Sequence, residues 1–95
     1  MKVTEFNVED YLDNDEVRNY YLQEVIKENN SYEFLKALEI IAKSKGMTKV
    51  AKESGVTREG LYKAFSANGN PAFSTVCKIL NAVGYTFSIS PIKSA

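Results

Sequence analysis

The chain of 95 residues is long enough for one domain with one modest core, and its composition, 44% hydrophobic and 25% charged, is typical of a folded globular protein. It has no histidine, which excludes Ser–His and Cys–His nucleophilic pairs and histidine metal ligands. A carboxylate-only or lysine-based enzyme stays possible, but no spacing indicates one, so we expect no enzyme, no metal site and no cofactor. The formal net charge of zero divides into −5 over residues 1–30 (three basic, eight acidic) and +5 over residues 31–95 (nine basic, four acidic). Unless these charges cluster by chance, the split indicates a basic partner for the first part and a polyanion for the second.

The compartment is indicated by three features of the chain. The first residues, MKVTEFNVED, lack the apolar stretch of a signal peptide, and no apolar run approaches the roughly 18 residues that span a membrane. The single cysteine, Cys77, cannot form an internal disulfide, and without a histidine to activate it we expect a packed thiol. We therefore expect a cytoplasmic protein with no membrane segment.

Two helices are predicted in the first half, after an irregular or briefly extended segment over residues 1–12. Asp13 and Glu16 have the spacing of an N-cap and its reciprocal carboxylate, which opens a helix that runs to about Glu28. Asn30 and Glu33 repeat this spacing and open a second helix to about Ser44, which Gly46 is expected to close in a left-handed conformation. The residues predicted to face inward are Val17, Tyr21, Leu22, Val25, Ile26, Phe34, Leu35, Leu38, Ile41 and Ala42.

Three further helices and a strand are predicted in the second half. Two short helices, 48–54 and 58–65, are followed by a turn, SANGNPAF, and by a helix over 73–83 with Gly84 as its stop. That last helix is expected to bury Phe73, Val76, Leu80 and Val83. Over residues 85–91, Tyr85, Phe87 and Ile89 alternate with polar residues until Pro91, which is a strand pattern. The fold class is thus all-α: five helices and one short C-terminal β-strand in a single domain, residues 1–95.

The two short helices are predicted to form a helix-turn-helix. Gly55 fits the tight turn, because a left-handed backbone there would strain any residue with a β-carbon. Ala51 is small enough for the helices to cross closely, and Thr57 has the chemistry of an N-cap. Val50, Val56, Leu61 and Phe65 supply the buried side. The alternative is a helical hairpin without a ligand.

The outward residues of this unit suit DNA. Arg58 can make a two-pronged contact with guanine, while Glu59 can accept from cytosine or hold Arg58 in place. Tyr62 and Lys63 can reach bases or phosphate, and the amino end of the first short helix can meet a phosphate. The residues predicted to contact DNA are Thr48, Lys49, Thr57, Arg58, Glu59, Tyr62, Lys63, Asn68 and Asn70.

With these residues in view, nearly the whole chain resembles a known family. Residues 47–91 resemble the C-terminal half of the small addiction-module antidote proteins, the HigA-like antitoxins with a lambda-repressor/Cro-type helix-turn-helix, and residues 6–46 resemble their N-terminal half. The most specific part is SGVTREGLYKAFS followed by GNP. Two positions depart from the pattern: Lys49, where Gln is common, and Ala72, where a Ser cap is common. The domain then divides into an acidic segment with the first helix (1–30), a helix-turn-helix core (31–84) and the strand (85–91).

The resemblance implies an antidote that blocks a small toxin, usually RelE/ParE-like, and that represses its own operon as a dimer bound to operator DNA. Because such toxins are usually basic, we expect the acidic half to meet the toxin. The residues expected to bind it are Glu5, Phe6, Glu9, Asp10 and Tyr11, although their apolar members can instead pack on the domain itself. Dimerisation is expected through the strand, with Tyr85, Phe87 and Ile89.

Two other functions stay open at this point. One is a phage-like helix-turn-helix repressor without a toxin partner. The other is a helical interaction module whose helix-turn-helix no longer contacts DNA. A small basic reading frame beside the gene separates the antidote from the phage-like repressor, and binding to the gene's own upstream DNA tests the interaction module.

Overall fold

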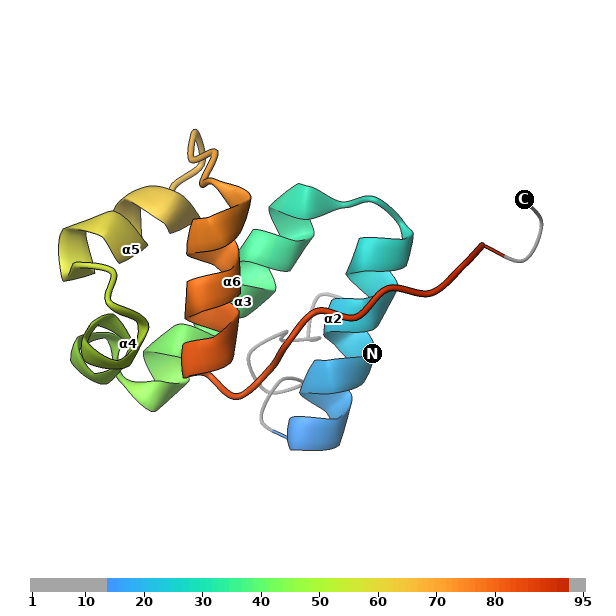
Figure 1. Cartoon of the computed structure of the whole chain (residues 1–95), viewed down its shortest axis with the longest axis horizontal. Coiled ribbons are helices and arrows are strands. Elements are labelled where there is room, and N and C mark those ends of the chain that lie inside the picture. Colours follow the sequence, from blue (N-terminus) through green and yellow to red (C-terminus); the bar gives the residue numbers. More distant parts are fainter. Residues whose placement is uncertain (1–13, 93–95) are drawn as a thin grey trace, which may run out of the picture.

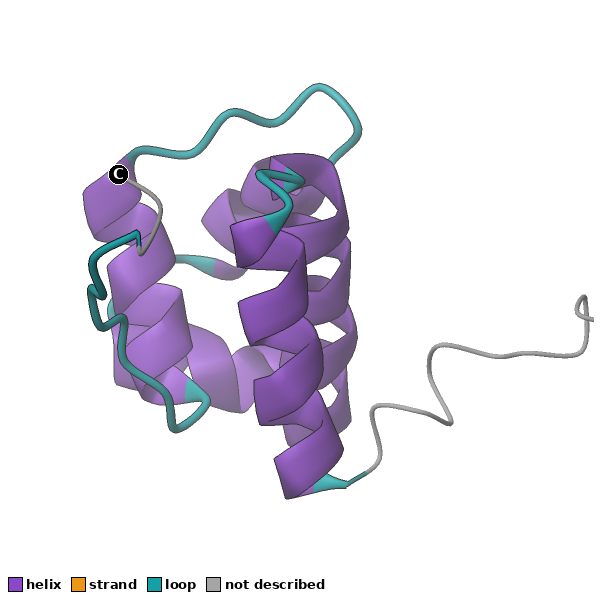
Figure 2. Ribbon diagram, turned by 90° about the vertical axis from the view of Figure 1, so that its right-hand side faces the viewer, coloured by secondary structure: helices purple, strands orange, loops and turns teal. Residues whose placement is uncertain are grey.

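The computed structural model describes residues 14–92, and this range forms five helices, α2 to α6 (Figure 1). Their bounds are α2 Asp15–Lys27, α3 Ser31–Lys45, α4 Met47–Ser54, α5 Arg58–Phe65 and α6 Phe73–Ala82. All five predicted helices are present, so the all-α class is confirmed. Figure 2 shows no strand between residues 14 and 92, and the predicted strand over 85–91 is therefore wrong. No helix in this range is long and apolar enough to cross a bilayer.

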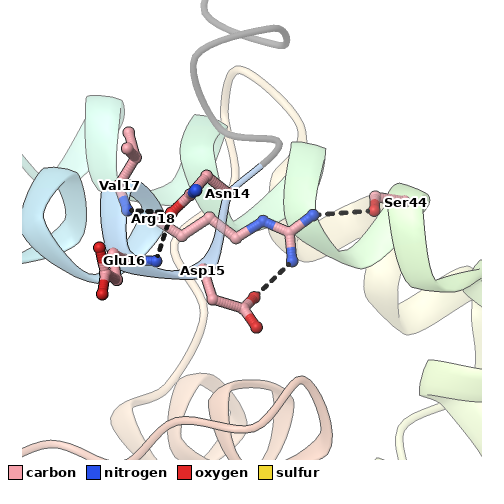
Figure 3. Close-up of polar contacts among 6 residues, drawn as sticks. All are labelled: Asn14, Asp15, Glu16, Val17, Arg18 and Ser44. Atoms are coloured by element: carbon pink, nitrogen blue, oxygen red, sulfur yellow. Dashed lines mark hydrogen bonds and ion pairs between the residues drawn. The ribbon is translucent and has the colours of Figure 1, made fainter.

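An asparagine begins α2. The Asn14 side chain accepts hydrogen bonds from the backbone N–H groups of Glu16 (2.8 Å) and Val17 (3.1 Å), as Figure 3 shows. The prediction that Asp13 caps this helix is wrong by one residue, because Asn is as good an N-cap as Asp. Asp13 itself lies outside the described residues.

The ends of α3 follow the prediction. The Asn30 side chain accepts a hydrogen bond from the backbone N–H of Glu33 at 3.1 Å, which confirms it as the cap. Gly46 ends the helix with a positive φ of 105°, as predicted, but its ψ of 116° is not that of a left-handed helix. This ψ lets the chain enter α4 directly, since Gly46 both closes α3 and precedes the first residue of α4.

The core forms where four helices meet. Its largest fully buried side chains are Leu38 and Ile41 of α3, Val50 of α4, Leu61 of α5 and Ile79 of α6. The helix α4 packs against α3, α5 and α6, and α2 packs against α3. The two short helices are thus held by a common core, which supplies stability that helices of eight residues lack in isolation.

Two residues predicted to be buried are exposed. Phe73 has 69% of its surface accessible and Ile26 has 44%. Phe73 is the first residue of α6, where it lies at the rim of the core, and the inward face of α6 is instead formed by Ile79 and Leu80. Ile79 is buried although the sequence pattern did not single it out, because the predicted stripe began from Phe73.

The C-terminal segment after α6 is extended but unpaired. Gly84 turns the chain with a φ of 101°, and residues 85–92 run across α2 (Figure 1). The Phe87 ring stacks between Phe34 (centroids 5.8 Å apart) and Phe73 (5.4 Å). Ile89 is 96% exposed. Of the alternating residues, Tyr85 and Phe87 pack against the core and Ile89 does not, and the segment has no partner strand in the described chain.

An arginine links α2 to α3. Arg18 is only 8% exposed; its Nη1 lies 3.2 Å from Asp15 Oδ1, and its Nη2 donates to Ser44 Oγ at 3.1 Å (Figure 3). Ser44 lies in the last turn of α3, where the partial negative charge of the helix end favours a cation. Only 10% of the Arg18 side chain is accessible, so its aliphatic stem is buried together with the guanidinium. Arg18, a residue type usually found at the surface, thus links α2 to α3.

Replacing this arginine tests the link. Arg18→Ala removes the buried stem and both polar contacts, so we expect the free energy of unfolding in urea to fall by about 1–3 kcal/mol. The matched control is Lys27→Ala on the same helix, whose Nζ lies 3.6 Å from Glu24 Oε2 in an exposed ion pair. That variant should stay within about 0.5 kcal/mol of the parent. Equal losses in the two variants would contradict a structural role for Arg18.

Candidate nucleic-acid interface

The turn between α4 and α5 has the conformation that its glycine was predicted to supply. Gly55 has φ 81° and ψ 6°, in the left-handed region, and its N–H donates to the Ala51 carbonyl at 3.0 Å. The Ser54 hydroxyl accepts a hydrogen bond from the backbone N–H of Val56 at 3.1 Å. Hydrogen bonds on both sides of Gly55 therefore fix the angle at which α5 leaves α4.

A cap and a second glycine complete this turn. The Thr57 Oγ1 accepts from the Gly60 N–H at 2.9 Å, which confirms Thr57 as the cap of α5. A β-carbon at position 60 would lie 3.0 Å from Val56 Cγ1 and 3.1 Å from Thr57 Oγ1. Gly60 therefore leaves room for Val56 and the cap to approach α5, which explains a residue that otherwise disfavours a helix.

The predicted inner side of this unit is confirmed. Val50 and Leu61 are fully buried and Phe65 is buried, while Ala51 and Val56 are partly buried against the core. The residue types that sequence reasoning placed at the helix crossing are thus the ones that fix α4 and α5 to the domain. The opposite side of the two helices is left to solvent.

The predicted DNA-contacting side chains are all accessible to solvent, seven on or beside α4 and α5 and two in the loop after α5. All nine are exposed: Thr48, Lys49, Thr57, Arg58, Glu59, Tyr62, Lys63, Asn68 and Asn70. The two helices carry four exposed basic residues, Lys49, Lys52, Arg58 and Lys63, against the exposed acids Glu53 and Glu59, a net charge of +2. Lys52 was not among the residues predicted to contact DNA. It lies one helical turn after Thr48 on α4, and this spacing could have placed it on the same exposed face.

Arg58 contacts Tyr62 and not Glu59. The Arg58 Nη2 donates to the Tyr62 hydroxyl at 3.2 Å, and its guanidinium carbon lies 5.8 Å from the centroid of the Tyr62 ring. Among residues 14–92, no ion pair joins Arg58 to Glu59. Of the two roles predicted for Glu59, holding Arg58 in place is therefore wrong, because Tyr62 lies one helical turn away on the same face and Glu59 does not.

The amino end of α4 retains unused backbone donors. The helix begins at Met47, so Thr48 lies in its first turn and does not open it. The residue at the cap position is Gly46, and no side chain caps this end. Free N–H groups at a helix amino end favour a phosphate, and the exposed Lys49 adds a positive charge beside them.

The loop after α5 folds back on that helix. The Gly69 N–H donates to the Ser66 carbonyl at 2.8 Å, and the Ser66 hydroxyl donates to the Lys63 carbonyl at 2.9 Å. These bonds hold the exposed Asn68 and Asn70 beside the carboxyl end of α5. The following helix, α6, has no side-chain cap at Ala72, as its sequence predicted.

The remaining predictions concern toxin binding, metal ligands and the cysteine. The residues expected to bind a toxin, Glu5, Phe6, Glu9, Asp10 and Tyr11, lie outside the described residues. Between residues 14 and 92, no group of three His, Cys, Asp or Glu side chains is arranged to hold a metal ion. Cys77 is a partly buried thiol on α6.

One titratable group near α2 is perturbed. Burial raises the pKa of the Tyr85 hydroxyl, and the carboxylate of Asp15 raises it further, while the Arg18 guanidinium opposes both. The phenol therefore stays neutral at physiological pH. Tyr85, one of the residues predicted at the dimer interface, is half-buried beside the amino end of α2.

Comparison with known proteins identifies the family of the chain. A family model described as "Probable addiction module antidote protein" matches residues 2–91. The chain belongs to this family. An uncharacterised protein of Haemophilus influenzae (strain ATCC 51907 / DSM 11121 / KW20 / Rd) is 37% identical over 94 residues, which cover 99% of this chain and 97% of that relative. No solved structure matches the chain significantly.

Proposed function

We propose that this antidote-family protein has two activities: it neutralises a small basic toxin of the RelE/ParE-like kind, and as a dimer it binds operator DNA and represses its own operon. The proposal of DNA binding rests on the geometry of the α4–α5 unit. Its turn is fixed at Gly55, its inner side is buried, and its exposed side presents Arg58 and three lysines. The first activity rests on family membership and on the charge of residues 1–30.

In this proposal α5 is the recognition helix. An α-helix with its side chains is about 10–12 Å across, which fits the width of about 12 Å of the major groove. Arg58 in its first turn reads guanine through O6 and N7, and Lys63 contacts the phosphate backbone. The amino end of α4, with Thr48 and Lys49, meets a phosphate of the adjoining strand and fixes the register. Base contacts then select the sequence, and phosphate contacts supply most of the affinity.

The dimer we propose places two such units on one face of DNA, with half-sites about one helical turn (roughly 34–36 Å) apart. The C-terminal segment supplies the apolar surface for it. Phe87 is already stacked between two rings of its own domain, whereas Ile89 (96% exposed) and Ile92 (73% exposed) are free of it. Two exposed isoleucines within four residues of an extended segment favour burial against a second copy.

Toxin binding is assigned to the acidic part of the chain, with Glu5, Phe6, Glu9, Asp10 and Tyr11 as the contact residues. Charge complementarity accelerates the encounter with a basic partner, and the aromatic side chains among the acids supply anchors that can be buried on binding. The two activities then use opposite ends of the charge distribution, so one protein can hold toxin and DNA at once.

Substitution of Arg58 tests DNA binding. Arg58→Ala should weaken binding to a duplex from the gene's own upstream region by about 1–3 kcal/mol and relax the preference at one base pair. Lys49→Ala should weaken binding to all DNA sequences alike and reduce the salt dependence of binding. The assay is fluorescence anisotropy at several salt concentrations. If Arg58→Ala binds its operator as tightly as the parent, α5 is not the recognition helix.

Ile89→Lys tests the dimer without disturbing the core. A charge at this exposed position should shift the protein to monomer in sedimentation velocity and weaken operator binding, while the helical circular-dichroism signal of the folded chain is retained. Lys78→Ala, on the exposed side of α6, is the control and should leave the association state unchanged. A dimer that survives Ile89→Lys places the interface elsewhere.

Charge reversal of Glu5, Glu9 and Asp10 to Lys tests toxin binding. Association with the product of the adjacent gene should slow on the order of tenfold or more, while operator affinity holds or rises slightly. The comparison variant is Glu53→Lys on α4, which should raise operator affinity and leave toxin association unchanged. The rate of toxin association and the operator affinity are both measured by surface plasmon resonance with the purified proteins. If the triple variant binds toxin normally and loses DNA, the two ends of the chain have been assigned the wrong way round.

A further inference from the structure

Two residues of the recognition surface are already in contact before any DNA binds. Arg58 and Tyr62 are one turn apart on α5, a spacing at which side chains on a helix meet. The Arg58 Nη2 donates to the Tyr62 hydroxyl at 3.2 Å, and the guanidinium carbon lies 5.8 Å from the ring centroid. Both side chains are exposed, with Tyr62 at 45%, so neither the core nor a buried charge requires this contact.

The contact leaves Arg58 able to bind a base. A guanidinium has five N–H donors, two of them on Nη2. One Nη2 hydrogen is donated to Tyr62. The other Nη2 hydrogen and an N–H of a neighbouring guanidinium nitrogen can still donate together to the two acceptors of a guanine. Tyr62 therefore holds the side chain without using the edge that a guanine needs.

We propose that Tyr62 is a positioning residue that orders the Arg58 guanidinium for guanine in the free protein, so that the two side chains select one base pair as a unit. The inference rests on the proposed DNA binding and adds to it a role for Tyr62 other than a separate contact with base or phosphate. The physical gain is entropic. A long arginine side chain loses rotamer freedom when it is fixed on DNA, and a side chain that is already held loses less.

The chain offers a matched control on another helix. Tyr32 and Lys36 of α3 have the same spacing, with Lys36 Nζ lying 5.9 Å from the centroid of the Tyr32 ring. Tyr32 is 54% exposed and lies outside the α4–α5 unit. Tyr32→Ala thus removes an exposed cation–ring pair of the same kind without changing the proposed DNA-binding surface.

The first experiment examines the free protein by NMR. Ring currents of Tyr62 should shift the side-chain signals of Arg58, and Tyr62→Ala should return them to values typical of an exposed arginine. Tyr62→Phe should keep most of the ring-current shift, because it removes only the hydroxyl acceptor. Arg58 signals that are the same in the parent and in Tyr62→Ala would overturn the proposal, whatever the protein does with DNA.

The second experiment is a double-mutant cycle on DNA. A duplex is first selected from a library of random 20-base-pair sequences with the parent protein, and the base pair read by Arg58 is identified with Arg58→Ala. Tyr62→Ala should weaken binding about two- to fivefold and flatten discrimination at that same base pair. In the Arg58→Ala background it should have little further effect. Tyr62→Phe should fall between Tyr62→Ala and the parent, and Tyr32→Ala should match the parent.

The outcomes separate the inference from the proposed function. Additive losses from Arg58→Ala and Tyr62→Ala, or a loss of discrimination at a different base pair, would show that Tyr62 contacts DNA by itself and would overturn the positioning role. A parent protein that selects no duplex would refute the proposed DNA binding, and the inference falls with it. Non-additive losses at one base pair support both.

Discussion

The angle between α4 and α5 is set at one residue, Gly55, whose left-handed backbone directs α5 out of the line of α4. The turn alone would not hold that angle. The angle is also held by hydrogen bonds, from the Gly55 N–H to Ala51 and from the Val56 N–H to Ser54, and by the cap at Thr57. Val50 of α4 and Leu61 of α5, both buried, fix the two helices to the core. Every proposed contact with DNA depends on this geometry, because α5 can enter a groove only if α4 and the core stand clear of it. A residue with a β-carbon at position 55 would strain the turn on which the surface is built.

The rest of the domain supports this unit from behind. The helix α3 is central: it supplies Leu38 and Ile41 to the core, and Arg18 ties α2 to its last turn through Ser44. The C-terminal segment crosses α2 and is anchored by Phe87 between Phe34 and Phe73. The helix α2 thus lies on the opposite side of α3 from α4 and α5 (Figure 1). This arrangement is compatible with separate partners of opposite charge.

Features that depend on neighbours in the sequence could be predicted, and features that depend on distant residues could not. Most helix caps, the Gly55 turn and the exposed face of α5 follow from residues within one or two turns of each other, and the sequence predicts them. The exceptions are the shift of the α2 cap from Asp13 to Asn14, the ψ of Gly46, and the start of α4 at Met47 before Thr48. The burial of Arg18 depends on Ser44, 26 residues away. The unpaired C-terminal segment depends on rings from α3 and α6, and a strand pattern of period two does not distinguish a paired strand from an extended segment packed on helices.

The central claim is that the exposed face of α4, the turn and α5 is the surface that DNA meets. The most direct measurement is an amide chemical-shift titration of the protein with a duplex from the gene's own upstream region. We expect the signals that move to cluster at Thr48 and Lys49, over residues 57–63 and over residues 68–70, while those of α2 stay in place. Shifts concentrated on α2 or on the C-terminal segment, with α5 unchanged, would contradict it.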